Sequence, residues 1–281
     1  MKGSAGIDGE ATGRRRGRRW VGAGLAVVVI AVIALVVAQG GGSGGGPLNA
    51  IAKAAEVTQR EPGGRALIRA TITVSNTPEG ITEDGSLVFD DSGRSRGTLT
   101  VQGHSTGKEV KVTTIADGTK TYATSDAFDS IPEGKKWMEL DYSSAVSASG
   151  SAVPDNVGPE EGLKILERVE GAKEIGKEVI GGVPTTRYRG TLPTAAEVFG
   201  VKTHFSALNV DVWIDAQHRV RRMQAVVSGT VGEAEDRTTT EMTIDYVEFG
   251  RVSKIEPPPA DEVFDATGEI ESRVQSAAEG H

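Results

Sequence analysis

The sequence predicts a mainly β protein of the α+β class, with one antiparallel sheet of about eleven strands, a few helices and one preceding transmembrane helix. Apolar and polar residues alternate over many short runs that end in turn residues, as in antiparallel strands with one solvated face. A few other stretches have the spacing or end signals of helices. One long stretch near the N-terminus has neither charged nor strongly polar side chains.

That stretch is Trp20–Ala38 (WVGAGLAVVVIAVIALVVA). As a helix with a rise of roughly 1.5 Å per residue it would span about 28 Å, close to the thickness of a bilayer core. Five arginines precede it, so the positive-inside rule makes residues 1–19 a cytoplasmic basic tail and places the rest of the chain outside. We predict an uncleaved signal-anchor over 20–38. A cleavable secretory signal ending at Ala38 is the alternative, and it too exports the chain.

Residues 39–47 form a Gly-rich linker, which would hold the next domain close to the membrane. From residue 20 onward the chain has 25 basic against 37 acidic side chains, which argues against nucleic acid or anionic head groups as the main partner. The sequence has no cysteine, hence no disulfide, thiolate metal site, thiol nucleophile or thioether-linked lipid. The extracytoplasmic domain, predicted over 48–264, must be stable through packing alone.

The domain begins with an amphipathic helix over Leu48–Arg60, in which Leu48, Ile51, Ala52 and Ala55 share one face. Period-two alternation then predicts eleven strands. They lie near residues 68–74, 84–90, 95–104, 107–116, 119–125, 135–142, 173–180, 183–192, 210–215, 219–229 and 237–249.

Three segments interrupt or follow the strands. A long loop is predicted over 143–157, and a helix over 158–169 that has proline at its first position and acidic residues in its first turn. A short helix is predicted over 193–199, ending before Gly200. Residues 265–281 are predicted to be a disordered tail.

Alternation also predicts which side chains share the apolar face of the sheet. Three helices are a thin cover for so wide a sheet, so part of this face is predicted to enclose a cavity. The candidate cavity residues are Ile68, Ala70, Ile72 and Val74, then Met223, Ala225 and Val227, then Met242, Ile244 and Tyr246. Thr243 and Asp245 are predicted to point away from it.

No catalytic motif fits its context. Gly41–Gly45 matches G-x-S-x-G, but no strand precedes it and no helix follows, so it is linker. The four histidines have no metal-ligand spacing. Trp137 and Trp213 are candidates for ligand stacking or, more simply, for packing on the sheet. We therefore predict no enzyme, no cofactor and no metal.

Several segments resemble the actinobacterial lipid-carrying lipoproteins of the LppX/LprG type, which are relatives in fold of the lipoprotein carrier LolA. They are Lys135–Leu140 (KKWMEL), Gly181–Leu192 (GGVPTTRYRGTL), Val210–Met223 (VDVWIDAQHRVRRM), Met242–Gly250 (MTIDYVEFG) and Pro257–Asp265 (PPPADEVFD). The resemblance implies a curved antiparallel half-barrel, with helices on its concave side and an apolar cavity for acyl chains. Those relatives carry a lipobox cysteine that this chain lacks, so a transmembrane helix would replace the acyl anchor.

The leading hypothesis is a membrane-tethered extracytoplasmic protein that binds acyl chains of a lipid or glycolipid, for lipid transport or transfer. It would bind lipid acyl chains and would be attached to the cell membrane through residues 20–38. It would not bind nucleic acid. The alternative is a non-enzymatic envelope sensor or interaction module that binds a protein partner through the same sheet.

Overall fold

The computed structural model describes residues 47–128, 131–143, 163, 166–167, 169–192, 197–198, 201–205, 208–231, 237–269 and 271–272. Its elements in chain order are α2 (Pro47–Gln59), β1 (Gly63–Val74), β2 (Gly80–Asp90), β3 (Ser95–Gly103), β4 (Glu109–Asp117), β5 (Lys120–Thr124), β6 (Trp137–Asp141), β7 (Glu170–Ile180), β8 (Val183–Leu192), β9 (Glu197–Val198), β10 (Val201–Phe205), β11 (Leu208–Asp215), β12 (Val220–Val231), β13 (Thr238–Phe249), the 3₁₀ turn η2 (Ala260–Glu262) and β14 (Val263–Asp265).

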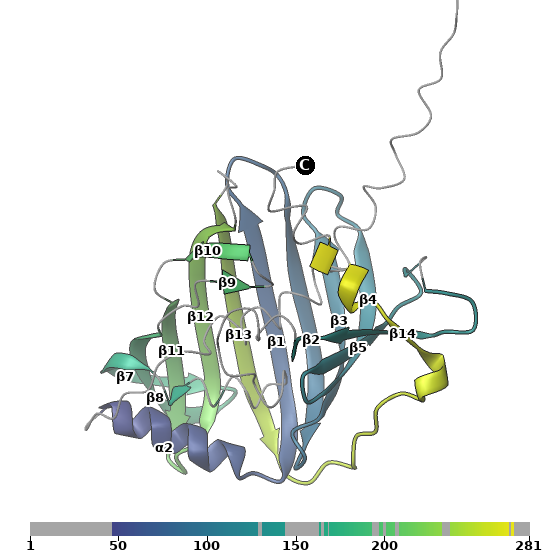
Figure 1. The fold of residues 1–281 in the computed structure, drawn as a ribbon. Coiled ribbons are helices and arrows are strands. Elements are labelled where there is room, and N and C mark those ends of the chain that lie inside the picture. The colour runs from purple at the N-terminus through teal and green to yellow at the C-terminus, as the bar shows by residue number, and fades with distance from the viewer. Residues whose placement is uncertain are drawn as a thin grey trace, which may run out of the picture.

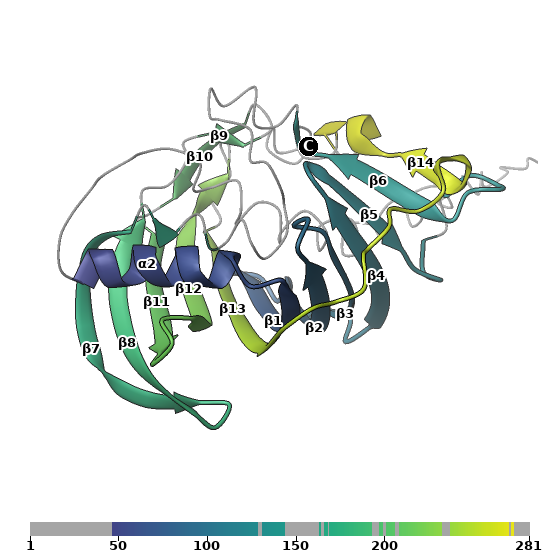
Figure 2. The same cartoon turned by 90° about the horizontal axis from the view of Figure 1, so that it is seen from below.

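The strands form one large open sheet (Figure 1). Twelve of them follow the order β14-β6-β5-β4-β3-β2-β1-β13-β12-β11-β8-β7, while β10 pairs with β12 and β9 pairs with β10. Neighbouring strands are antiparallel except that β14 is parallel to β6. Figure 2 shows that the sheet is strongly curved and twisted between β7 at one end and β6 with β14 at the other. The mainly β fold with an open antiparallel sheet is therefore confirmed.

All eleven predicted strands are present, and β1 begins five residues earlier than predicted. The strand opens with the pair Gly63-Gly64. A Cβ added at Gly64 would lie 2.3 Å from the backbone oxygen of Glu248 and 2.7 Å from the ring of Phe89. Glycine is thus required because β13 and an aromatic ring pass close to the backbone there.

The three strands that the sequence did not predict are β9, β10 and β14, each of five residues or fewer. The helix predicted over 193–199 is wrong at Glu197 and Val198, which pair with Lys202 and Val201 of β10. Pairing with a neighbouring strand outweighs helix propensity, which is a weak preference. Most of the helix predicted over 158–169 lies outside the described residues, although Leu163 and Leu166 are helical and buried.

The structure describes the C-terminal end of the chain further than it does the N-terminal end. The predicted span Trp20–Ala38 lies outside the described residues, and among those that are described no helix combines the length and apolarity needed to cross a membrane. At the other end, structure continues past the predicted boundary at Phe264. Strand β14 extends to Asp265, Ala266 is buried in the core, and 267–269 and 271–272 are helical.

Helix α2 covers part of the apolar face, where it contacts β7, β11 and β12. Its buried side chains are Ile51, Ala54, Ala55 and Thr58, so the predicted amphipathic helix is confirmed with its face centred slightly differently. The Thr58 hydroxyl donates to the Ala54 carbonyl (2.7 Å) and accepts the backbone N–H of Val220 (2.8 Å). This buried pair of hydrogen bonds fixes the helix to the start of β12.

Candidate functional site

The ten predicted cavity residues lie on one face of three adjacent strands, β1, β13 and β12. Cross-strand pairs connect Ile68 with Ile244 and Met242 with both Ala70 and Ala225. Nine of the ten are buried, and Val74, at the end of β1, is half-buried. We call this side of the sheet the apolar face. Its nine buried residues belong to one core cluster that also includes Ile51, Ala54 and Ala55 of α2.

Small side chains recur along one cross-strand row of this face. From β1 to β8 the row runs through Ala70, Met242, Ala225, Val210 and Gly190, each paired with the next across the sheet. Ala70 and Ala225 are buried, and Val169 covers Gly190, where an added Cβ would lie 2.2 Å from Val169 Cγ1. Three of the five residues in this row are alanine or glycine.

A carboxyl group lies at the β2 end of the same row. Glu83 pairs with Ala70 on one side and with Val101 on the other, and its side chain is fully buried. Burial raises the pKa of Glu83 from 4.5 to about 8, because an ionised carboxylate is poorly solvated in apolar surroundings. The sequence prediction missed this residue because the predicted strand began at 84. Period-two spacing from Ile81 and Leu87 could have placed it on the apolar face.

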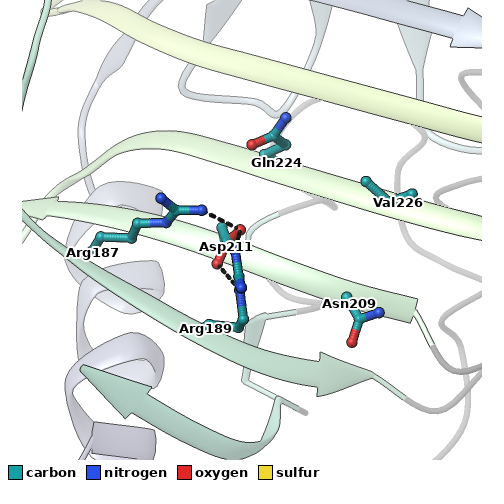
Figure 3. A pocket seen from close by; sticks show the side chains of 6 residues that line it. All are labelled: Arg187, Arg189, Asn209, Asp211, Gln224 and Val226. Carbon is teal, nitrogen blue, oxygen red and sulfur yellow. Dashed lines mark hydrogen bonds and ion pairs between the residues drawn. The ribbon is translucent and has the colours of Figure 1, made fainter. Parts of the chain in front are cut away.

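The opposite, polar face carries a pocket of about 460 Å³ over β8, β11 and β12 (Figure 3). It is lined by Arg187, Arg189, Asn209, Asp211, Gln224 and Val226. Arg187 donates to Asp211 at 2.9 Å, and Arg189 donates to both carboxylate oxygens at 2.8 Å. Burial opposes ionisation of Asp211, but hydrogen bonds from Arg189 and Arg187 outweigh it and lower its pKa. The two guanidinium groups are thus engaged within the sheet.

Trp213 belongs to the same polar face and is held by neighbouring side chains. Its indole N–H donates to Glu178 at 2.9 Å, and the guanidinium carbons of Arg187 and Arg222 lie 4.8 and 5.8 Å from the ring centre. Asp245 accepts two hydrogen bonds from Arg222, so this residue does point away from the apolar face as predicted. Trp213 is buried and packs on the sheet, and Trp137 packs against a second, smaller core cluster.

Within the described part of the chain, no three His, Asp or Glu side chains lie close enough together to hold a metal ion. His218 has a positive φ of 59° and lies in the turn between Asp215 and Arg219. Asp215 accepts the backbone N–H groups of Gln217 and Arg219, which organises that turn.

The fold and the apolar face define an open, curved β-sheet protein with a large apolar surface on one side. A family profile, described as the LppX_LprAFG lipoprotein family, matches residues 47–249. The chain belongs to this family.

Three known proteins illustrate the similarity. A Streptomyces griseus protein, described as an uncharacterized 31.2 kDa protein in the rplA-rplJ intergenic region, is 26% identical over 246 residues, covering 76% of this chain and 78% of its own. The crystal structure of Mycobacterium tuberculosis lipoprotein LppX matches with a TM-score of 0.42 at 19% identity, covering 75% of this chain and 98% of LppX. LprF from Mycobacterium bovis matches with a TM-score of 0.38 at 11% identity, covering 76% and 97%.

Proposed function

We propose that this chain is a membrane-tethered, extracytoplasmic protein that binds the acyl chains of a lipid or glycolipid on the apolar face of its sheet, without catalysing a reaction. The observation that carries the proposal is the cross-strand row, in which the small residues Ala70 and Ala225 alternate with Met242 and Val210 on a continuous apolar face. Membership of a lipoprotein family supports the same role.

The physical need for such a surface is large. Each CH₂ group removed from water contributes about 0.8 kcal/mol, so a sixteen-carbon chain in water carries a penalty on the order of 12 kcal/mol. A protein that keeps the chain dry between two membranes, or between a membrane and a partner, removes most of that barrier. The apolar face of the sheet is proposed to supply that dry surface.

The proposed anchor is the uncleaved span Trp20–Ala38, with the N-terminus in the cytoplasm. Its support is the uninterrupted apolar run, which is long enough to cross a bilayer core, in a sequence without a cysteine to carry a thioether-linked lipid. N-terminal sequencing of the membrane-bound protein should start in residues 1–19. A sequence that starts at Gln39 would show that the span is removed.

The binding role is tested by mass spectrometry of lipids that co-purify with the full chain from detergent-solubilised membranes. A pair of variants on β12 tests whether the lipid binds to the apolar face or to the polar face. Ala225 is buried in the row, whereas Val226 is the next residue and lines the pocket on the polar face. Ala225→Trp fills space above the row and should lower bound acyl lipid at least about twofold. Val226→Trp should leave it unchanged.

Three outcomes contradict the proposal. The first is wild-type protein that carries no acyl lipid above the level of a detergent-solubilised membrane protein of similar size. The second is an equal loss of lipid in Ala225→Trp and Val226→Trp, because binding would then not depend on the apolar face. The third is unfolding of Ala225→Trp, which would indicate a filled core with no room for an acyl chain, since overpacking typically costs about 1–3 kcal/mol.

A further inference from the structure

Glu83 is an ionisable group buried among apolar residues of the core, and no described residue forms a hydrogen bond with its carboxyl group. Its side chain is fully buried, and neither carboxyl oxygen has a hydrogen-bond partner within the described residues. Its neighbours across the strands are Ala70 and Val101, both members of the core cluster. Buried polar groups nearly always have hydrogen-bond partners, so this exception requires an explanation.

The polar face of the sheet shows how this protein otherwise treats carboxylates. Asp84, the next residue, accepts a hydrogen bond from Arg69 at 2.6 Å. Asp211 and Asp245 each accept hydrogen bonds from arginine. Glu83 differs from all three because it faces the other way, among apolar residues.

The protonation state decides which ligand group Glu83 can bind. Burial raises the pKa of Glu83 to about 8, so the neutral acid predominates at pH 7. A neutral carboxyl has one O–H donor, and its complement in a lipid is an acceptor oxygen. The nearby hydroxyl of Tyr142 already hydrogen-bonds with the side chain of Thr121.

We propose that Glu83 binds the ester carbonyl of an acyl ester lipid, with the carboxyl O–H donating to the carbonyl oxygen while the acyl chain lies along the row over Ala70 and Ala225. The inference rests on the proposed function and narrows its ligand from apolar molecules in general to acyl esters. From β2 to β11 the row crosses four inter-strand spacings, or about 19 Å, which is comparable with an extended long acyl chain. The carboxyl group of Glu83 would thus lie next to the ester group at the end of the acyl chain.

The test compares trioleoylglycerol, which has three esters, with squalene, a hydrocarbon without oxygen, on the full chain in detergent micelles. Native mass spectrometry measures the bound fraction of each probe. Wild type should prefer trioleoylglycerol by about tenfold, the ratio expected from one buried hydrogen bond. Glu83→Gln keeps a donor and should keep the preference. Glu83→Leu should lose it while still binding squalene.

Infrared spectroscopy of trioleoylglycerol labelled with ¹³C at its carbonyls gives an independent measurement. A hydrogen-bonded ester carbonyl absorbs at lower wavenumber than a free one, so wild type and Glu83→Gln should show a lowered band that Glu83→Leu lacks. Equal binding of the two probes by wild type, or the same band in wild type and Glu83→Leu, would overturn the role of Glu83 and leave lipid binding intact. Binding of neither probe would refute the proposed function itself.

Discussion

The buried carboxyl of Glu83 should make the folded state more stable in acid than at mildly alkaline pH. Its pKa is 4.5 without burial and about 8 in the folded chain. Between these values the folded protein holds a proton that the unfolded protein has released, so the free energy of unfolding falls as pH rises. The slope approaches about 1.4 kcal/mol per pH unit, and the whole window is worth on the order of 5 kcal/mol.

Glu83→Gln removes the titration while keeping the shape of the side chain. The assay is urea unfolding of wild type and variant from about pH 5 to about pH 8, followed by tryptophan fluorescence. Tyr142, which is also buried, has a raised pKa and stays neutral throughout, so it does not contribute. As pH rises, the unfolding free energy of the variant should increase relative to that of wild type. Parallel pH profiles for the two proteins would refute the reasoning.

Three substitutions test the packing of the sheet through chemical unfolding. Thr58→Val leaves the backbone N–H of Val220 without its acceptor and should cost about 1–3 kcal/mol, whereas Thr58→Ser should cost less. Gly190→Ala places a Cβ 2.2 Å from Val169 Cγ1, which should cost about 1–3 kcal/mol and be partly rescued by Val169→Ala. Ile244→Glu puts a second carboxyl on the apolar face and should cost more than about 3 kcal/mol, and a smaller effect would mean that this face is open to water.

The facing of the central strands could be predicted from sequence because side chains alternate with a period of two. Alternation places Ile68, Met242 and Ala225 on one face, and all three belong to the same core cluster. Asp245 was placed on the other face for the same reason. The local sequence pattern is sufficient to predict which side chains face the core wherever a strand is long and one of its faces is buried.

Other features depend on contacts that no local pattern records. Strands β9, β10 and β14 are too short to show alternation, and they form because a neighbouring strand supplies hydrogen-bonding partners. The burial of Glu83 depends on Ala70 and Val101, which approach it only once three strands are paired. The enclosure of Asp211 by two arginines likewise requires β8 and β11 to pair in register.

The pairing of β1 with β13 at the centre of the sheet has a consequence for how the chain folds. Arg65 and Glu248, which form an ion pair across these strands, are 183 residues apart in sequence. Contacts of such high sequence separation require closure of a long loop and are formed slowly. Strands β1 to β6 can pair in order as the chain emerges, but β1 keeps an open hydrogen-bonding edge until β13 arrives. The folding of this domain is therefore completed only after nearly all of it has been synthesised.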